Sequence, residues 1–522
     1  MFEIFICSFF NKQIYAIKET TASNATPIPN NNAIPSNVGT HTLVLYRIEV
    51  MTSLSLKIST STCVASIEAF RRCHLTFLSL FVEYNRHLLI TIVEYNRQEE
   101  RIMNHETLKQ IIFDQHEVIK KSQIVSRDYV FDKNANYVLI GLRRSGKSTL
   151  LYKRVQDLVS NGVDWKQIIY INFDDERLLG FQASDFEDIL LTAEEITSQK
   201  HYFYFDEIQN IDGWEKFAIR MANTKEKVDI TGSNAKMLSH EVSAKLGGRY
   251  LTKIIHPYSF KEFLRAKSLD ASSAFSVSDR AEIVNALREF YRFGGFPESL
   301  ASVDKREYVS NIYEKILLGD IITRNAIRSE NGMRVLIKKI AGTISQDVSY
   351  TNLYHALKTI GFSLSKDTII DYCFYANQSF LLFTLKNYYA AFVDKESNSK
   401  FYFSDNGILN LFLAQDDTSL FENLVAVSLK QKYQDKLYYL KSSKTKIDID
   451  FLVDEENIAV QACYSMANAE TANREVGQLK KLDATNPGKY KLMIITMNET
   501  GSIPLEHNVI HIIKLQDFLL SN

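Results

Sequence analysis

Residues 141–148 read Gly-Leu-Arg-Arg-Ser-Gly-Lys-Ser and match the phosphate-binding P-loop pattern G-x-x-x-x-G-K-[ST] at every fixed position. Gly141 and Gly146 allow the backbone to turn sharply and to approach phosphate oxygens closely. Lys147 supplies a positive charge to the β- and γ-phosphates of a nucleotide, and the hydroxyl of Ser148 is a ligand for Mg²⁺. The octet therefore predicts a nucleotide-phosphate site.

The residues on either side of the loop fit this interpretation. Residues 137–140 form a short apolar run typical of a buried parallel strand, and residues 149–152 continue as a helix. A strand, a glycine loop and a helix in this order direct the positive end of the helix at an anion. The sequence predicts that nine consecutive residues bind the phosphates of ATP: Gly141, Leu142, Arg143, Arg144, Ser145, Gly146, Lys147, Ser148 and Thr149.

A second motif supplies two carboxylates. Residues 202–207 read Tyr-Phe-Tyr-Phe-Asp-Glu, an apolar strand that ends in two acids, which is the Walker B arrangement. We expect Asp206 to hold Mg²⁺ through water and Glu207 to polarise the attacking water as the catalytic base. Between the two motifs in the sequence, residues 167–173 form another buried-strand pattern.

Two weaker signals lie further along the chain. Residues 227–234 read as a strand with a polar tip, where Asn234 or Ser233 is expected to contact the γ-phosphate or the lytic water, although ordinary turn chemistry explains the same residues. Arg249, after two glycines, is a candidate arginine finger within its own chain or across a subunit interface, or a surface arginine without that duty. The expected catalytic residues are Glu207, Lys147, Asn234 and Arg249.

Taken in order, the motifs resemble those of one family. Gly-Leu-Arg-Arg-Ser-Gly-Lys-Ser-Thr, Tyr-Phe-Asp-Glu-Ile-Gln-Asn, Ile-Thr-Gly-Ser-Asn-Ala, Leu-Gly-Gly-Arg-Tyr and His-Pro-Tyr-Ser-Phe-Lys-Glu-Phe-Leu look like the prokaryotic AAA-type ATP-binding proteins with a C-terminal domain of unknown function. The resemblance runs from about Met103 to the C-terminus. It implies an α/β P-loop NTPase fold with an additional strand between the P-loop strand and the Walker B strand, and ATP and Mg²⁺ as cofactors. Gln209 and a glycine turn at residues 294–298 match the same family.

Patterning divides the chain into five parts. Residues 1–102 show no sustained helix or strand period and are interpreted as an extension, either dispensable or an artefact of start assignment. We predict an AAA-type P-loop domain over 103–265 and a helical lid over 266–345. A winged-helix-like region over 346–410 and a restriction-endonuclease-like α/β domain over 411–522 complete the expected fold.

The winged-helix outline consists of a helix at 350–357, a glycine turn, a second helix at 368–375 and an apolar hairpin. In a DNA-binding protein the second helix would enter the major groove, but here Lys366 alone adds positive charge near it. A module that only packs against its neighbours is the open alternative. The basic residues of the preceding helices either contact DNA phosphates or form a solvated face: Arg324, Arg328, Arg334, Lys338 and Lys339.

The last hundred residues resemble the restriction-endonuclease core, whose signature is Asp followed by Glu-x-Lys. We place Glu422 on an amphipathic helix and Asp450 at the end of a strand. The glutamate position is Gln461 and the lysine position is Cys463. Since an amide is a poor ligand for a hard metal ion and a thiol cannot replace an ammonium, we expect a nuclease-like fold without nuclease activity.

The bulk properties leave the function to these motifs. The chain has 522 residues and a net charge of -1, which gives no global attraction for nucleic acid or membranes. Its 5 cysteines lack C-x-x-C spacing and no apolar stretch reaches membrane-spanning length, so we expect a cytoplasmic protein.

We expect an ATPase that couples nucleotide state to its C-terminal half, acting on an unknown protein partner, on DNA or through self-association. The alternatives are a nucleotide-gated DNA-binding or adaptor switch with slow hydrolysis, and a metal-dependent DNA nuclease.

Overall fold

The computed structural model describes residues 105–233, 246–272, 276–391, 397–414 and 416–521. The chain divides into two compact units, Met1–Glu99 and Glu100–Asn522, and all described residues belong to the second. The predicted extension and Asn234 therefore lie outside the described residues. In the described part of the chain, no helix is both long enough and apolar enough to cross a membrane.

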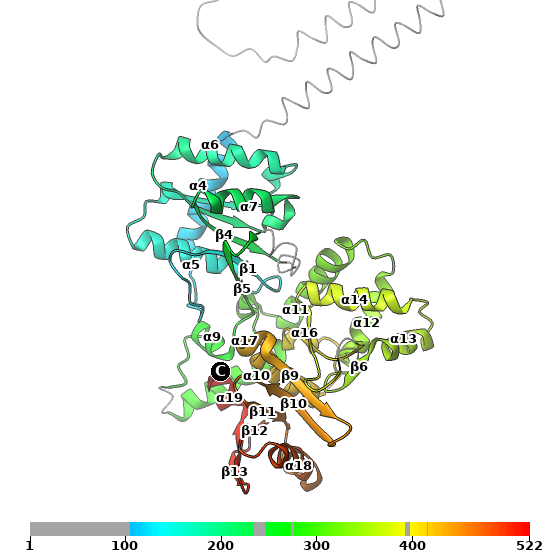
Figure 1. Ribbon diagram of the computed structural model, residues 1–522. Coiled ribbons are helices and arrows are strands. Elements are labelled where there is room, and N and C mark those ends of the chain that lie inside the picture. The colour runs from blue at the N-terminus through cyan, green and yellow to red at the C-terminus, as the bar shows by residue number, and fades with distance from the viewer. Residues whose placement is uncertain (1–104, 234–245, 273–275, 392–396, 415, 522) are drawn as a thin grey trace, which may run out of the picture. The chain divides into compact units, whose positions relative to one another are not determined.

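A five-stranded parallel sheet carries the P-loop (Figure 1). Four of its strands are almost fully buried because helices cover both faces, whereas the edge strand Tyr250–Ile254 is partly exposed. The predicted additional strand is present between the P-loop strand and the Walker B strand. In sequence it follows the Walker B motif, whereas the strand that lies between the two motifs in sequence forms an edge of the sheet. In spatial order the strands are β2 (Ile168–Asn172), β3 (Tyr202–Asp206), β4 (Lys227–Gly232), β1 (Asn136–Ile140) and β5 (Tyr250–Ile254).

Helices pack on both faces of this sheet. On one face, α5 (Lys147–Ser160) contributes Leu150, Leu151 and Val155 to a cluster with strand tyrosines. On the other face lie α6 (Phe186–Ile196) and α7 (Trp214–Asn223), where Phe186 stacks on Phe217 with ring centroids 4.1 Å apart. The first described helix contacts α5, α6 and β2. It and the short connecting helices are α4 (His105–Lys121), η1 (Trp165–Gln167), η2 (Glu176–Leu178), η3 (Ala183–Asp185) and η4 (Ile208–Asn210).

After β5 the described elements up to Ala341 are all helices. Two helices here begin with capping boxes, in which Ser259 and Ser276 bond to the third residue of the helix and receive a bond in return. One segment has the wider turn of a π-helix. In chain order the elements are α9 (Phe260–Ala266), α10 (Val277–Phe293), η6 (Pro297–Ala301), α11 (Lys305–Lys315), the π-helix η7 (Ile316–Thr323) and α12 (Glu330–Ala341).

A small antiparallel sheet follows, with two helices between its strands. The helices predicted at 350–357 and 368–375 are present as α13 (Tyr350–Thr359) and α14 (Lys366–Gln378). The spatial order of the strands is β6-β8-β7, which places the last strand in the middle. Their bounds are β6 (Asp347–Ser349), β7 (Leu382–Leu385) and β8 (Asn398–Phe403).

A six-stranded mixed sheet forms the C-terminal part. It consists of β13 (Gly501–Pro504), β14 (Val509–Lys514), β12 (Lys491–Thr496), β11 (Ile458–Ala462), β10 (Ile447–Val453) and β9 (Leu437–Ser442), in spatial order. Strands β11, β12 and β14 run parallel to one another. The helices of this part are α16 (Asn406–Leu409), α17 (Asp417–Tyr433), η8 (Gln434–Lys436), α18 (Ala469–Thr485) and α19 (Leu515–Ser521).

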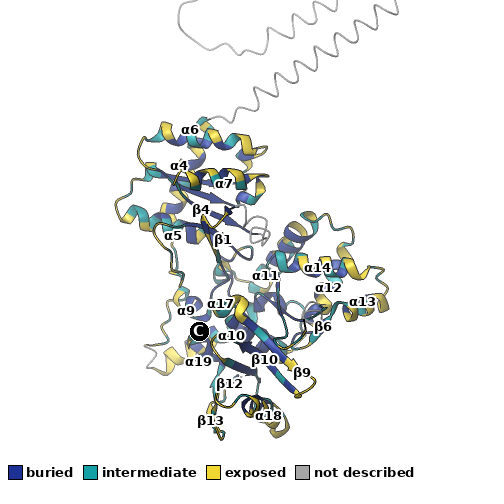
Figure 2. Cartoon of the chain, viewed as in Figure 1, coloured by how far each residue is buried: buried dark blue, intermediate teal, exposed yellow. Residues whose placement is uncertain are grey.

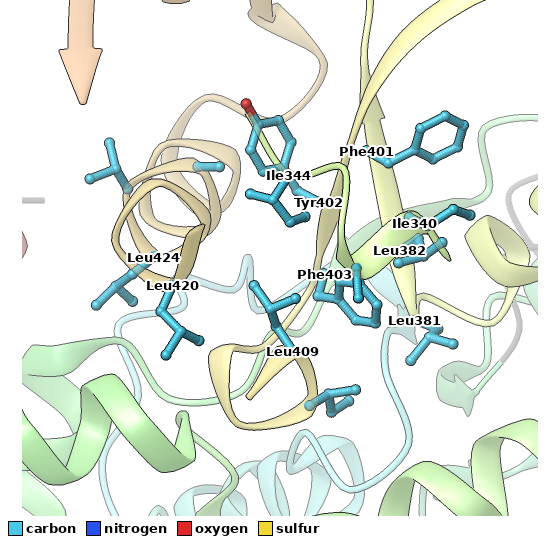
Figure 3. Packing of buried hydrophobic residues seen from close by; sticks show 14 of the residues in the cluster. Ile340, Ile344, Leu381, Leu382, Phe401, Tyr402, Phe403, Leu409, Leu420 and Leu424 are labelled. Carbon is cyan, nitrogen blue, oxygen red and sulfur yellow. The ribbon is translucent and has the colours of Figure 1, made fainter. Parts of the chain in front are cut away.

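One hydrophobic cluster joins the elements that follow β5. Figure 3 shows Ile340 of α12, Leu382 of β7, Phe401 of β8 and Leu424 of α17 among its members. The backbone also connects the two sheets, because the N–H of Tyr388 donates to a β9 carbonyl oxygen at 2.8 Å. The parts predicted as lid, winged-helix-like region and nuclease-like domain therefore share a core.

The helix that carries Glu422 differs from the prediction. Every residue of α17 from Leu420 to Val427 is buried (Figure 2). The helix contacts β8, β9, β11, α10 and α16, so neighbours surround its central turns. The expectation of an amphipathic helix was wrong because the two sheets and the lid helices enclose α17 from opposite sides.

Candidate nucleotide-binding site

The P-loop connects the carboxyl end of β1 to α5. Gly141 has a φ of 148°, and a Cβ at this position would lie 2.1 Å from the carbonyl oxygen of Ile255, so only glycine fits. Gly146, with a φ of 96°, is the N-cap of α5. The first turn of α5, which begins at Lys147, therefore presents its free N–H groups at the loop, as an anion site requires.

Lys147 and Glu207 lie together at the carboxyl edge of the sheet. The Lys147 ammonium donates to the carbonyl oxygens of Gly141 and Leu142, both at 3.2 Å. Its Nζ lies 3.8 Å from Oε1 of Glu207. Parallel pairing of β1, β4 and β3 brings the two residues to the same edge, although sixty positions separate them in the chain.

Glu207 is held in a constrained conformation. Its φ is 52°, in the left-handed region, and its N–H donates to the hydroxyl of Thr231 at 3.0 Å. The Gln209 amide donates to the Glu207 carboxylate. Burial raises the pKa of Glu207, but the charge of Lys147, the Gln209 hydrogen bond and the charge of Arg143 lower it more, so the pKa is lowered overall. Glu207 is therefore ionised at neutral pH, as a general base must be.

Asp206 accepts three side-chain hydrogen bonds. The donors are the hydroxyls of Tyr170, at 2.9 Å, of Thr231 and of Ser148. Burial and the neighbouring charge of Glu207 nevertheless raise the pKa of Asp206. The Asp206 carboxylate and the Ser148 hydroxyl are hard oxygen donors, and Mg²⁺ in nucleotide sites takes one or two protein oxygens beside phosphate oxygens and water. The residues present thus fit Mg²⁺.

Sequence reasoning missed Tyr170 and Thr231. Tyr170 belongs to the edge strand β2, and only the register of β2 against β3, in which Tyr170 pairs with Tyr204, brings its hydroxyl to Asp206. Thr231 lies within the Ile-Thr-Gly-Ser-Asn-Ala segment that carried the resemblance, so a signal for it existed. Ser233 from the same segment is buried next to the Gln209 amide, at 3.5 Å.

Arg249 lies at the opposite end of the sheet. It precedes β5, whose last residue, Ile254, pairs with Ile140 beside the P-loop. Five strand residues at about 3.3 Å each place Arg249 roughly 16 Å from that edge, and its guanidinium donates to Asn223 at 2.7 Å. The predicted role of Arg249 within its own chain was therefore wrong, while a role across a subunit interface stays a prediction.

The remaining loop residues differ in their surroundings. Arg143 and Arg144 point their charges at acids of the helical region, Asp320 at 3.4 Å and Glu298 at 2.7 Å. Leu142 packs into the core of that region. Ser145 is buried and Thr149 is exposed.

The glycine turn at 294–298 packs closely against the backbone of Tyr258 and the side chain of Asp405. The N–H of Gly295 donates to the Asp405 carboxylate at 2.8 Å, and its carbonyl oxygen accepts from the N–H of Tyr258 at 2.7 Å. Gly294 has a φ of 75°, and a Cβ there would lie 1.9 Å from the same carboxylate. Burial raises the pKa of Asp405 to about 6, although backbone N–H groups oppose this. The turn therefore fixes the start of η6, which carries Glu298 to the P-loop.

Gly294→Ala is expected to lower the free energy of unfolding by about 2–4 kcal/mol, from the strained backbone and from the clash with Asp405. Gly477→Ala is the matched control, because Gly477 lies in α18 with open space around its Cα. That change is expected to stabilise the protein by up to about 1 kcal/mol. Urea unfolding midpoints measure both, and equal midpoints for the two variants would contradict the assigned turn geometry.

Comparisons with known proteins agree with this geometry. Residues 133–264 match the model of the AAA domain family, and residues 284–419 match a family described as a domain of unknown function. An uncharacterized protein of Methanocaldococcus jannaschii is 32% identical over 406 residues, which cover 75% of this chain and 89% of that protein. The chain described here belongs to the same family as the Methanocaldococcus jannaschii protein.

A second relative is an uncharacterized protein of Haemophilus influenzae, 30% identical over 342 residues that cover 63% of this chain and 82% of that protein. A solved structure, the Walker-type ATPase PABY2304 of Pyrococcus abyssi, matches 56% of this chain and 99% of its own with 15% identity and a TM-score of 0.35. The family match over residues 133–264 and the five-stranded parallel sheet together show an AAA-type domain with an α/β P-loop fold.

Proposed function

We propose that this AAA-domain protein is a Mg²⁺-dependent ATPase that cleaves the β–γ bond of ATP. The position of Glu207 supports this most strongly, since its ionised carboxylate lies 3.8 Å from the P-loop lysine. A base for water and a cation for the γ-phosphate thus lie at one edge of the sheet. Phosphate binding alone needs only the cation, whereas hydrolysis needs both groups.

The roles follow from the contacts. The backbone of residues 141–149 would cradle the phosphates, and Lys147 would leave its two carbonyl partners for the β- and γ-phosphates. Ser148 and Asp206 would hold Mg²⁺, which neutralises phosphate charge when bound. Glu207 would accept the proton of the attacking water, with Gln209 as a positioning residue for its carboxylate.

Two residues of the expected catalytic set stay proposals. Asn234, outside the described residues, is still proposed to contact the γ-phosphate or the lytic water. Arg249 is proposed to act on the nucleotide of a neighbouring copy, which requires self-association.

The C-terminal half is proposed to respond to the nucleotide as one body. Its parts share a core, and P-loop side chains contact it through two ion pairs, Arg144 with Glu298 and Arg143 with Asp320. A change at the phosphates would therefore reach residues far from the sheet. The partner that receives this change is proposed to be a protein.

DNA binding is the weaker alternative. The order α12, β6, α13, α14 and a hairpin supports a winged-helix assignment for residues 346–410. However, the exposed residues of α14 include Asp367, Asp371 and Phe374 beside Lys366, and carboxylates repel phosphates. Arg334 already pairs with Glu314 at 2.7 Å. Duplex DNA binding that weakens with salt and differs between ATP and ADP would favour the alternative.

The nuclease alternative conflicts with the contacts of the two acids. The mixed sheet with α17 and α18 supports a restriction-endonuclease-like assignment for residues 411–522. Lys400 of β8 lies 3.1 Å from Asp450 and 3.7 Å from Glu422. The second Asp450 oxygen accepts from the N–H of Ala462 at 3.1 Å. An ammonium from another sheet thus takes the position at which the two acids would need a metal ion.

The other two signature positions are occupied as well. The Gln461 amide donates to Glu475 at 2.8 Å and accepts from the N–H of Asp450 at 2.7 Å. Burial raises the pKa of Cys463 to about 11, so its thiol stays protonated. These contacts support the proposal that the nuclease-like part is catalytically inactive.

Phosphate release from ATP by the purified protein tests the proposed function. Release is expected with Mg²⁺ and is expected to stop with excess EDTA or with Lys147→Ala, because the phosphates lose their cations. Lys153→Ala is the matched control, since Lys153 lies on the same helix and pairs with Asp157 at its surface. Release at the wild-type rate from Lys147→Ala would refute the ATPase proposal.

A further inference from the structure

A buried carboxylate of the helical region lies against the P-loop. Asp320 belongs to the π-helix η7, and its side chain is 3% exposed. Its Oδ1 lies 3.4 Å from Nη1 of Arg143 and 3.1 Å from Nη2 of Arg324. One carboxylate oxygen is thus shared by two guanidinium groups, one from the P-loop and one from the residue that follows η7.

The cluster has more donors than acceptors. Nη1 of Arg324 is buried and has no hydrogen-bond partner among the described residues. Nη2 of Arg143 approaches a second acid, Asp174, only to 3.9 Å. Two guanidinium groups thus share one buried carboxylate oxygen, and a buried hydrogen bond of Arg324 is unmade, which is unfavourable.

This cluster is electrostatically part of the nucleotide site. Arg143 is one of the charges that lower the pKa of Glu207, the proposed base. Burial raises the pKa of Asp320 against the opposing charges of both arginines, and Glu207 raises it further. A terminal phosphate offers three acceptor oxygens and more negative charge than a carboxylate, so it satisfies two guanidinium groups better.

We propose that Asp320 holds Arg143 and Arg324 in the nucleotide-free protein and that the γ-phosphate of ATP takes both arginines from it. ADP lacks this phosphate and leaves the carboxylate in place. The inference rests on the proposed ATP site and adds to it a competitor built into the chain. Because η7 packs in the core shared by the C-terminal half, release of Asp320 gives that half a signal specific to the triphosphate.

Nucleotide affinities of the full chain test this competition. Asp320→Asn keeps the size of the side chain and removes its charge. The affinity for a non-hydrolysable ATP analogue is expected to rise by about 5- to 150-fold, the usual range of coupling between sites, while the affinity for ADP changes less. Asp174→Asn is the matched control: its carboxylate is 48% exposed and 3.9 Å from the same arginine, and both affinities should stay as in the wild type.

Each other outcome has a defined meaning. If Asp320 only stabilises its helix, Asp320→Asn lowers both affinities or leaves their ratio unchanged, and either result overturns the inference. If that variant does not fold, Arg324→Gln is measured instead and should weaken binding of the ATP analogue more than of ADP; equal losses overturn the inference. A wild-type protein that binds neither nucleotide would overturn the proposed function itself.

Discussion

Glu207→Gln is expected to slow phosphate release about 10²- to 10⁴-fold, the usual contribution of a general base. The amide has nearly the same size as the carboxylate but cannot accept the proton of the attacking water. ATP binding should persist, because the backbone of the loop and Lys147 remain in place. Single-turnover phosphate release measures the rate, and equilibrium binding of an ATP analogue measures the affinity.

The control for this change is another glutamate of the same domain. Glu187→Gln removes a surface carboxylate of α6 that pairs with Arg220 at 2.6 Å, and the rate should stay at the wild-type value. Loss of ATP binding together with hydrolysis in Glu207→Gln would mean that Glu207 maintains the loop rather than activates water. A rate within twofold of the wild type would exclude Glu207 as the base.

Lys400→Met is expected to lower the free energy of unfolding by about 3–5 kcal/mol, because it leaves the buried Glu422 and the partly buried Asp450 without their cation. Burial lowers the pKa of Lys400, but the charges of Asp450 and Glu422 raise it more, so the ammonium is charged in the folded protein. The Tyr402 hydroxyl donates to Glu422 at 2.8 Å and cannot replace that charge. Chemical denaturation monitored by far-ultraviolet circular dichroism measures the loss.

The loss should also depend on pH. Burial and the charge of Asp450 raise the pKa of Glu422 to about 7 even beside Lys400. Without the ammonium this pKa rises further, so the folded variant binds a proton that the unfolded chain releases near pH 4. The loss in the free energy of unfolding caused by Lys400→Met should therefore be larger at pH 8 than at pH 5.

Lys441→Met is the matched control for Lys400, since Lys441 forms an exposed pair with Asp347 and its loss should cost less than about 1 kcal/mol. Replacing Lys400, Asp450 and Glu422 together by Met, Asn and Gln should recover part of the stability, because no charge is then left unpaired. A single Lys400→Met variant as stable as the control would contradict the buried ion pair.

The nucleotide site was largely predictable from sequence because its chemistry is local. Gly141, Lys147 and Ser148 belong to one octet, and Asp206 and Glu207 belong to one strand end. For these residues, type and spacing in the sequence predict the proposed roles. The same locality explains why the two helices at 350–357 and 368–375 were expected near their observed bounds.

Predictions that depend on pairing between distant segments were less successful. The sequence order of the strands did not reveal that β4, rather than β2, lies between β1 and β3. Arg249 follows two glycines, a pattern that made it a candidate arginine finger. The strand direction of β5 nevertheless places it at the edge of the sheet opposite the P-loop. The apolar pattern of α17 looked one-sided, because the sequence does not show that neighbours enclose the whole helix.

The sequence by itself determined that this chain has a phosphate-binding loop followed by a pair of carboxylates at the end of a strand. Only the tertiary structure decided which residues complete these groups: Tyr170 and Thr231 at Asp206, Asp320 at Arg143, and Lys400 at Asp450. The physical reason is that a buried charge needs a partner, and in a folded chain that partner comes from whichever segment packs nearby, at any distance along the sequence.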